Sequence, residues 1–116
     1  MKVIDGYVHS GRIGVLVEIA LETSFTAGMA EFKQLAKDLA LQIAAFPVQT
    51  VDALMAQAFV KDNAVSVAEV IAKASAHLGE RIVVTRFVRW DTEDSQSQGP
   101  APPSAPAVAA HARKLA

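Results

Sequence analysis

The chain has no cysteine, and few of its 116 residues are prolines, glycines or aromatics. Without a thiol it can form no disulfide and no thiolate metal site, which fits a reducing compartment such as the cytoplasm. No apolar run reaches the roughly 18 residues of a transmembrane helix. The first ten residues also lack the long apolar segment of a secretory signal peptide. We therefore expect a cytoplasmic protein that does not enter a membrane.

The chain also lacks an excess of either charge, and it lacks the common catalytic motifs. The formal net charge is -1, and no basic cluster indicates a nucleic-acid partner. None of the three histidines stands in an H-x-x-x-H or H-E-x-x-H spacing, and no serine lies in G-x-S-x-G. A glycine-rich phosphate loop is missing too. The carboxylates Glu18, Glu22 and Asp38 alone do not indicate acid/base catalysis, so we expect no enzyme, no cofactor and no metal.

Proline is rare except near the end of the chain, where four of the five prolines lie between Pro100 and Pro106. Such a segment cannot bury enough apolar surface to offset its ordering entropy. We predict one ordered domain over residues 1–92 and a disordered Pro/Ala-rich tail over residues 93–116. Residues 108–115 could form only a transient helix, because they are too few for a stable isolated one.

A β-hairpin is predicted at the beginning of the domain. Residues 3–9 and 13–21 read as strands, and Ser10-Gly11 between them favours a primed turn, because glycine tolerates a positive φ. In the second strand, alternate residues share one apolar face, which must be covered by helices. These residues are Ile13, Val15, Val17, Ile19 and Leu21.

Three helices are expected after the hairpin. The first, Ala30–Ala45, has apolar residues at helical spacing and is followed by Pro47. A short helix over residues 51–57 would be capped by Thr50. The third would begin at Ser66, where Ser66 and Glu69 have the form of a capping box, and would end before Gly79.

The last predicted element is a strand over residues 81–91, which would return to pair antiparallel beside the hairpin. The fold class is then α+β, a two-layer sandwich of a three-stranded antiparallel sheet with about three helices on one face. Strict alternation puts one set of residues on one side: Ile82, Val84, Arg86, Val88 and Trp90. The other side carries Val83, Thr85, Phe87 and Arg89. Both sides are partly apolar, so we expect a homodimer packed through the sheet.

Several segments in register resemble elongation factor Ts, the nucleotide-exchange factor for elongation factor Tu. Residues 7–18 read YVHSGRIGVLVE, which is similar to the family's Y-x-H-x-G-R-I-G-V-L-V-E. Residues 32–44 resemble its helix motif F-x-x-L-A-K-D-x-A-x-x-I-A. Residues 58–62, AFVKD, and 78–84, LGERIVV, resemble its Q-P-F-V-K-D and I-G-E-N-I-V-V segments. The resemblance covers nearly all of residues 3–91.

Departures from the family pattern concentrate in the loop after the hairpin. The family's C-E-T-D-F-V-A-R-N becomes LETSFTAGM, with Ser24 for the Asp and Thr26 for the Val. The family's N-terminal helical module, and a helical insertion before the residue 58–62 segment, are expected to be absent. The resemblance therefore implies a short, divergent form of the elongation factor Ts core.

The resemblance implies that this loop and the hairpin turn contact elongation factor Tu, in its GDP-bound or nucleotide-free form. Phe25 would insert into the GTPase and disturb Mg²⁺ and phosphate binding. From the residues alone, Phe25 could equally pack under the first helix, and His9 could be an ordinary exposed turn residue. Arg12 could form a surface ion pair of little energetic weight. The candidate partner-binding residues are Phe25, Thr23, Ser24, Thr26, His9, Gly11 and Arg12.

The leading hypothesis is a factor that binds elongation factor Tu and promotes GDP release. Its alternative is a binding or dimerisation module of the same fold in which the altered loop no longer supports exchange. A truncated or degraded gene product is a third possibility.

Overall fold

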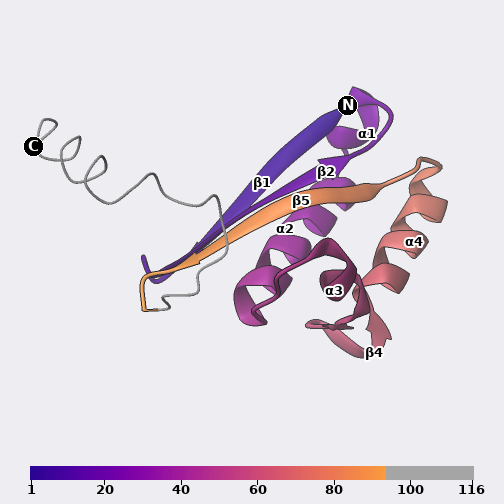
Figure 1. The fold of residues 1–116 in the computed structure, drawn as a ribbon. Coiled ribbons are helices and arrows are strands. Elements are labelled where there is room, and N and C mark those ends of the chain that lie inside the picture. The colour runs from indigo at the N-terminus through magenta and orange to yellow at the C-terminus, as the bar shows by residue number, and fades with distance from the viewer. Residues whose placement is uncertain (94–116) are drawn as a thin grey trace, which may run out of the picture.

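A three-stranded antiparallel sheet carries the helices on one of its faces (Figure 1). The structure is a computed structural model and describes residues 1–93, so all of the predicted tail except Glu93 lies outside the described residues. The elements are β1 (Lys2–His9), β2 (Ile13–Ala20), α1 (Ser24–Ala27), α2 (Ala30–Ala45), α3 (Val51–Ala56), β3 (Ala58–Phe59), β4 (Asp62–Ser66), α4 (Val67–Leu78) and β5 (Val83–Asp91). Strand β2 lies between β1 and β5 and is antiparallel to both. The predicted α+β class and sheet are confirmed.

The turn between β1 and β2 has the expected primed geometry. Ser10 and Gly11 have φ values of 54° and 65°, and the Arg12 amide donates to the His9 carbonyl at 2.9 Å. Positive φ at both central positions is what a type I′ turn requires, and it matches the twist of the paired strands. His9 pairs with Ile13, so the strands are connected by three residues, Ser10 to Arg12, and not by the two central turn residues alone, and Tyr7 pairs with Val15.

The core lies between the inner face of the sheet and α2. Val17 and Ile19 of β2 are fully buried, as are Leu39 and Ile43 of α2. Both sets follow the predicted periodicities of two for the strand and 3.6 for the helix. The bounds of α2 agree with the prediction because its apolar stripe and Pro47 are both local signals.

The ends of the shorter helices also agree with the sequence. The Thr50 hydroxyl accepts from the Ala53 amide at 3.1 Å at the start of α3. At the start of α4, Ser66 and Glu69 form the predicted capping box. Gly79 ends α4 in the left-handed conformation, with φ 71°. Each of these caps satisfies backbone groups that a helix end leaves unpaired.

The predicted alternation along β5 is wrong in its first half. Glu18 of β2 pairs with Arg86, whereas Ile19 pairs with Val84, so a β-bulge leaves Thr85 between the two paired positions. A bulge adds one residue to one strand and thereby exchanges the two faces. Val84 is consequently buried on the same side as Phe87 and Arg89, while Arg86 and Trp90 are exposed.

Two short elements were not predicted, the four-residue helix α1 and the hairpin of β3 and β4. The β3–β4 corner is held by Gln42, a fully buried side chain of α2. Its Nε2 donates to the Ala58 carbonyl at 3.0 Å, and its Oε1 accepts from the Val60 amide at 2.7 Å. A two-residue strand has no periodic pattern, so only tertiary hydrogen bonds define it.

Candidate functional site

Phe25 is the most exposed large apolar side chain in the described part of the chain. It lies in α1, which begins at the N-cap Thr23, and 80% of its surface is accessible. The Thr23 hydroxyl accepts from the Thr26 amide at 3.3 Å. Phe25 therefore projects outward from a capped turn of helix, and the alternative in which it packs under α2 is wrong.

The loop that carries Phe25 is bound to Glu80, which follows α4. One carboxylate oxygen of Glu80 accepts from the amides of Glu22 at 3.0 Å and Thr23 at 3.1 Å. The other accepts from the hydroxyls of Thr23 and Thr26, the latter at 2.6 Å. The hydrogen bonds from Thr23 and Thr26 favour the ionised form and lower the pKa of Glu80 to about 2.

A second contact runs in the opposite direction across the same gap. The Glu22 carboxylate accepts from the Arg81 amide at 2.6 Å. The Glu80 carbonyl in turn accepts from the hydroxyl of Ser75 in α4. The Phe25 loop and the end of α4 are thus cross-linked in both directions, through residues almost sixty positions apart in sequence.

Thr26 is the inward-facing member of the loop, with only 3% of its surface exposed. Ser24, beside it, is exposed and makes up the first residue of α1. Sequence reasoning named both residues but missed Glu80. The only signal was the resemblance of residues 78–84 to a family segment, which does not show what the carboxylate contacts.

The predicted hairpin residues lie at the other end of the sheet. His9, Gly11 and Arg12 surround the β1–β2 turn, whereas α1 follows the far end of β2 (Figure 1). Eight strand residues at about 3.3 Å each separate the two groups by roughly 25 Å. His9 Nδ1 lies 2.8 Å from the Tyr7 hydroxyl, and Arg12 forms an ion pair with Glu93 at 3.3 Å. The structure does not bring the seven predicted residues into one site.

The outer face of the sheet is largely apolar. Ile4 of β1, Leu16 of β2 and Trp90 of β5 each expose more than half of their surface, at 57%, 53% and 58%. They line a shallow groove of about 470 Å³ together with Val8 and Val88. Adjoining apolar side chains of this size on one face are typical of an interaction surface.

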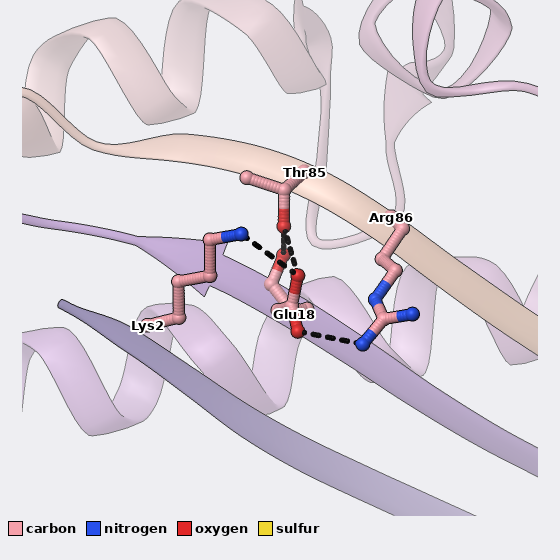
Figure 2. A network of polar contacts seen from close by, with 4 residues as sticks. All are labelled: Lys2, Glu18, Thr85 and Arg86. Carbon is pink, nitrogen blue, oxygen red and sulfur yellow. Dashed lines mark hydrogen bonds and ion pairs between the residues drawn. The ribbon is translucent and has the colours of Figure 1, made fainter.

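A network of charges borders this face at the bulge (Figure 2). Glu18 contacts Lys2 at 3.8 Å, the Thr85 hydroxyl at 2.7 Å and Arg86 Nη2 at 3.1 Å. The hydrogen bond from Arg86 is the main cause of a lowered pKa of Glu18, and the bond from Thr85 adds to it. Glu18 is buried, and its contacts keep its charge compensated there.

Residues 1–93 contain no group of three or more His, Cys, Asp or Glu side chains that could hold a metal ion. Within the same residues, each helix is too short or too polar to cross a bilayer.

Comparison with known proteins identifies the relatives of this chain. No protein-family model matches it. Its sequence is 32% identical to elongation factor Ts of Myxococcus xanthus over 77% of the chain, and 34% identical to that of Methylacidiphilum infernorum over 76%. The match to elongation factor Ts of a Nostoc species is 38% identical over 78% of the chain. The chain is a homologue of elongation factor Ts.

The chain is shorter than these elongation factor Ts relatives. It spans 62% of the Myxococcus protein, 66% of the Methylacidiphilum protein and 29% of the Nostoc protein. The Myxococcus alignment extends over 134 residues, more than the whole chain contains, so that relative has residues within the aligned stretch that have no counterpart here. The relatives are named as translation elongation factors, which agrees with the prediction of a protein that is not an enzyme.

Proposed function

We propose that the chain binds elongation factor Tu in the cytoplasm and promotes release of GDP, with Phe25 as the side chain that enters the partner. Homology to elongation factor Ts supports the partner. The observation that carries the mechanism is the exposure of Phe25 on a helical turn that is cross-linked to α4. An aromatic side chain presented in this way is suited to fill a pocket of the partner.

Exchange then follows from linkage between the two ligands of the GTPase. A protein that binds the nucleotide-free form more tightly than the GDP form must weaken GDP binding by the same factor. Phe25 can enter the partner at no cost to the core of its own protein, because its side chain is already exposed. The hairpin turn with His9, Gly11 and Arg12 would form a second, separate contact, which a partner of G-domain size can span.

The test is the release of a fluorescent GDP analogue from elongation factor Tu. Phe25→Ala should reduce the acceleration by roughly tenfold or more, as expected for a central aromatic contact. Phe46→Ala is the matched control, because Phe46 is an exposed phenylalanine at the end of α2. Both variants should melt like the wild type. If the wild-type protein leaves GDP release unchanged, exchange is not its function.

The alternative, a module that binds without exchange, follows from the altered loop. Ser24 stands at the start of α1, where an acidic residue would favour the helix N-terminus. If wild-type protein binds elongation factor Tu without accelerating GDP release, and Ser24→Asp restores the acceleration, the loop has lost its activity while the fold has been kept.

We also propose that two copies pair through the outer face of the sheet. An isologous contact would bring Leu16 and Trp90 of one copy against the same face of the other. Glu18 forms ion pairs with Lys2 and Arg86 of the same copy, so this network can lie at the rim of such an interface without a charged partner from the other copy. A domain of this size gains stability by burying the apolar face.

A further inference from the structure

The short helix α1 that carries Phe25 is held in place by residues from another part of the chain. Helix α1 has only four residues, which is far too short to be stable as an isolated helix. Phe25 contributes little to holding it, because its side chain lies in solvent. Its segment is anchored by a set of hydrogen bonds from residues 22–26 to a distant carboxylate, beside the bond that the Arg81 amide donates to Glu22.

We propose that Glu80 is a positioning residue, whose carboxylate holds residues 22–26 in the arrangement that projects Phe25. This inference rests on the proposed function for its consequence, but not for its geometry. Glu80 itself is oriented by Gly79, whose left-handed conformation turns the chain at the end of α4, and by the hydrogen bond from Ser75 to its carbonyl.

The two carboxylate oxygens of Glu80 contact different groups of the loop. Oε1 receives two backbone amides, those of Glu22 and Thr23, which fixes the path of the main chain. Oε2 receives the hydroxyls of Thr23 and Thr26, which fixes the rotation of α1 about its own axis. With Thr26 turned inward, Phe25 one residue earlier points about 100° away from it around the helix axis, and its side chain lies in solvent. A carboxylate has enough acceptor sites for all four bonds, whereas a neutral amide would place donors against donors.

A loop that is held in its binding arrangement loses less entropy when its partner binds. If only a fraction of the molecules holds Phe25 correctly, the apparent affinity falls by that fraction, and the response at saturation is unchanged. Loss of Glu80 should therefore raise the concentration needed for half-maximal GDP release. Loss of Phe25 should instead lower the maximal rate.

The first experiment needs no partner. Amide hydrogen exchange is measured at Glu22 and Thr23 in the wild type, in Glu80→Ala and in Glu80→Gln. Both variants should exchange faster at these two amides, by roughly tenfold or more in Glu80→Ala, because hydrogen bonds to a charged acceptor are lost. Chymotrypsin should likewise cut faster after Phe25 than in the wild type. Glu31→Ala is the control for loss of charge, since Glu31 is an exposed carboxylate in the first turn of α2.

The second experiment is GDP release at a series of factor concentrations. Glu80→Ala should shift the half-maximal concentration upward by roughly tenfold while the maximal rate is kept, and Glu31→Ala should match the wild type. If Glu80→Ala does not fold, Thr26→Val removes one hydroxyl bond without a change of shape and should give the same effects to a smaller extent.

Two outcomes would overturn the inference. Wild-type exchange at the Glu22 and Thr23 amides in folded Glu80→Ala would show that Glu80 does not hold the loop. Faster exchange there, together with an unchanged GDP-release curve while Phe25→Ala loses activity, would show that Phe25 does not need to be held. If neither wild type nor Phe25→Ala accelerates GDP release, the proposed function fails, and the hydrogen-exchange result still decides the role of Glu80.

Discussion

At the scale of the residue, two carboxylates that each accept several hydrogen bonds or ion pairs hold the surface features of this molecule in place. Glu80 collects the amides and hydroxyls of the Phe25 loop, and Glu18 collects Lys2, Thr85 and Arg86 at the bulge. Both carboxylates have lowered pKa values because these partners favour the ionised form. Neither role follows from composition, which does not show what a given glutamate contacts.

The lowered pKa of Glu80 predicts a pH dependence of stability. Its pKa is about 2 in the folded protein against an ordinary value of 4.5, so its contribution is complete above pH 4.5 and is lost as the pH falls toward 2. In Glu80→Gln, the free energy of unfolding should fall less steeply across this window. Urea unfolding at a series of pH values measures the slope.

Glu31→Gln is the control for loss of one negative charge, because Glu31 is an exposed carboxylate outside the Phe25 loop. If the free energy of unfolding of Glu80→Gln falls as steeply with pH as that of the wild type, the loop contacts do not lower the pKa of Glu80.

At the scale of the element, helix ends and strand faces are completed by side chains from other elements. Arg89 of β5 is only 5% exposed, and its guanidinium donates to the carbonyls of Ile43 at 3.0 Å and Ala44 at 3.1 Å. These carbonyls belong to the last turn of α2 and have no partner within the helix. The positive charge also complements the helix dipole at its C-terminal end. The bulge at Thr85 places Val84 on the same buried face of β5 as Arg89.

Replacing Arg89 should therefore destabilise the fold. Arg89→Met keeps the apolar part of the side chain and leaves both carbonyls buried without a donor, which should cost about 1–3 kcal/mol. Chemical denaturation measures the loss. Arg89→Lys retains the charge but not the planar fork of donors, so its stability should lie between those of Arg89→Met and the wild type. Equal stability of Arg89→Met and wild type would show that these carbonyls are satisfied in another way.

At the scale of the whole molecule, helices cover one face of the sheet, and no helix or strand of residues 1–93 covers the other (Figure 1). The open face carries Ile4, Leu16 and Trp90 and is flanked by the Glu18 network (Figure 2). An uncovered apolar face on a small domain limits solubility and favours association. We expect a second copy to cover it, which is the homodimer predicted from the partly apolar sides of the last strand.

A single charge in the centre of this face should separate the two copies. Leu16→Lys should shift the mass measured by light scattering from dimer to monomer at the same concentration, because burying an unpaired ammonium is costly. Phe46→Lys places the same charge on an exposed apolar position outside the sheet and should remain a dimer. A wild-type protein that stays monomeric throughout the concentration range would contradict the proposed pairing.

The sequence by itself determined the elements whose signals are local. The Ser10-Gly11 turn, the apolar stripe of α2, the Ser66 capping box and the Gly79 end of α4 depend on neighbours a few residues away, and each is confirmed. The sequence also predicted that the last strand joins the hairpin in an antiparallel sheet, and the structure places that strand beside β2.

Only the tertiary structure decided the features that depend on distant pairing. The bulge that exchanges the faces of β5 arises from its register against β2, and alternation within β5 does not reveal it. Phe25 is exposed because Thr26 and the loop amides meet Glu80, at sequence separations of 54 to 58 residues. Hydrogen bonds between residues so far apart form only once α4 has packed beside the end of β2, so a sequence pattern that reports local geometry cannot contain them.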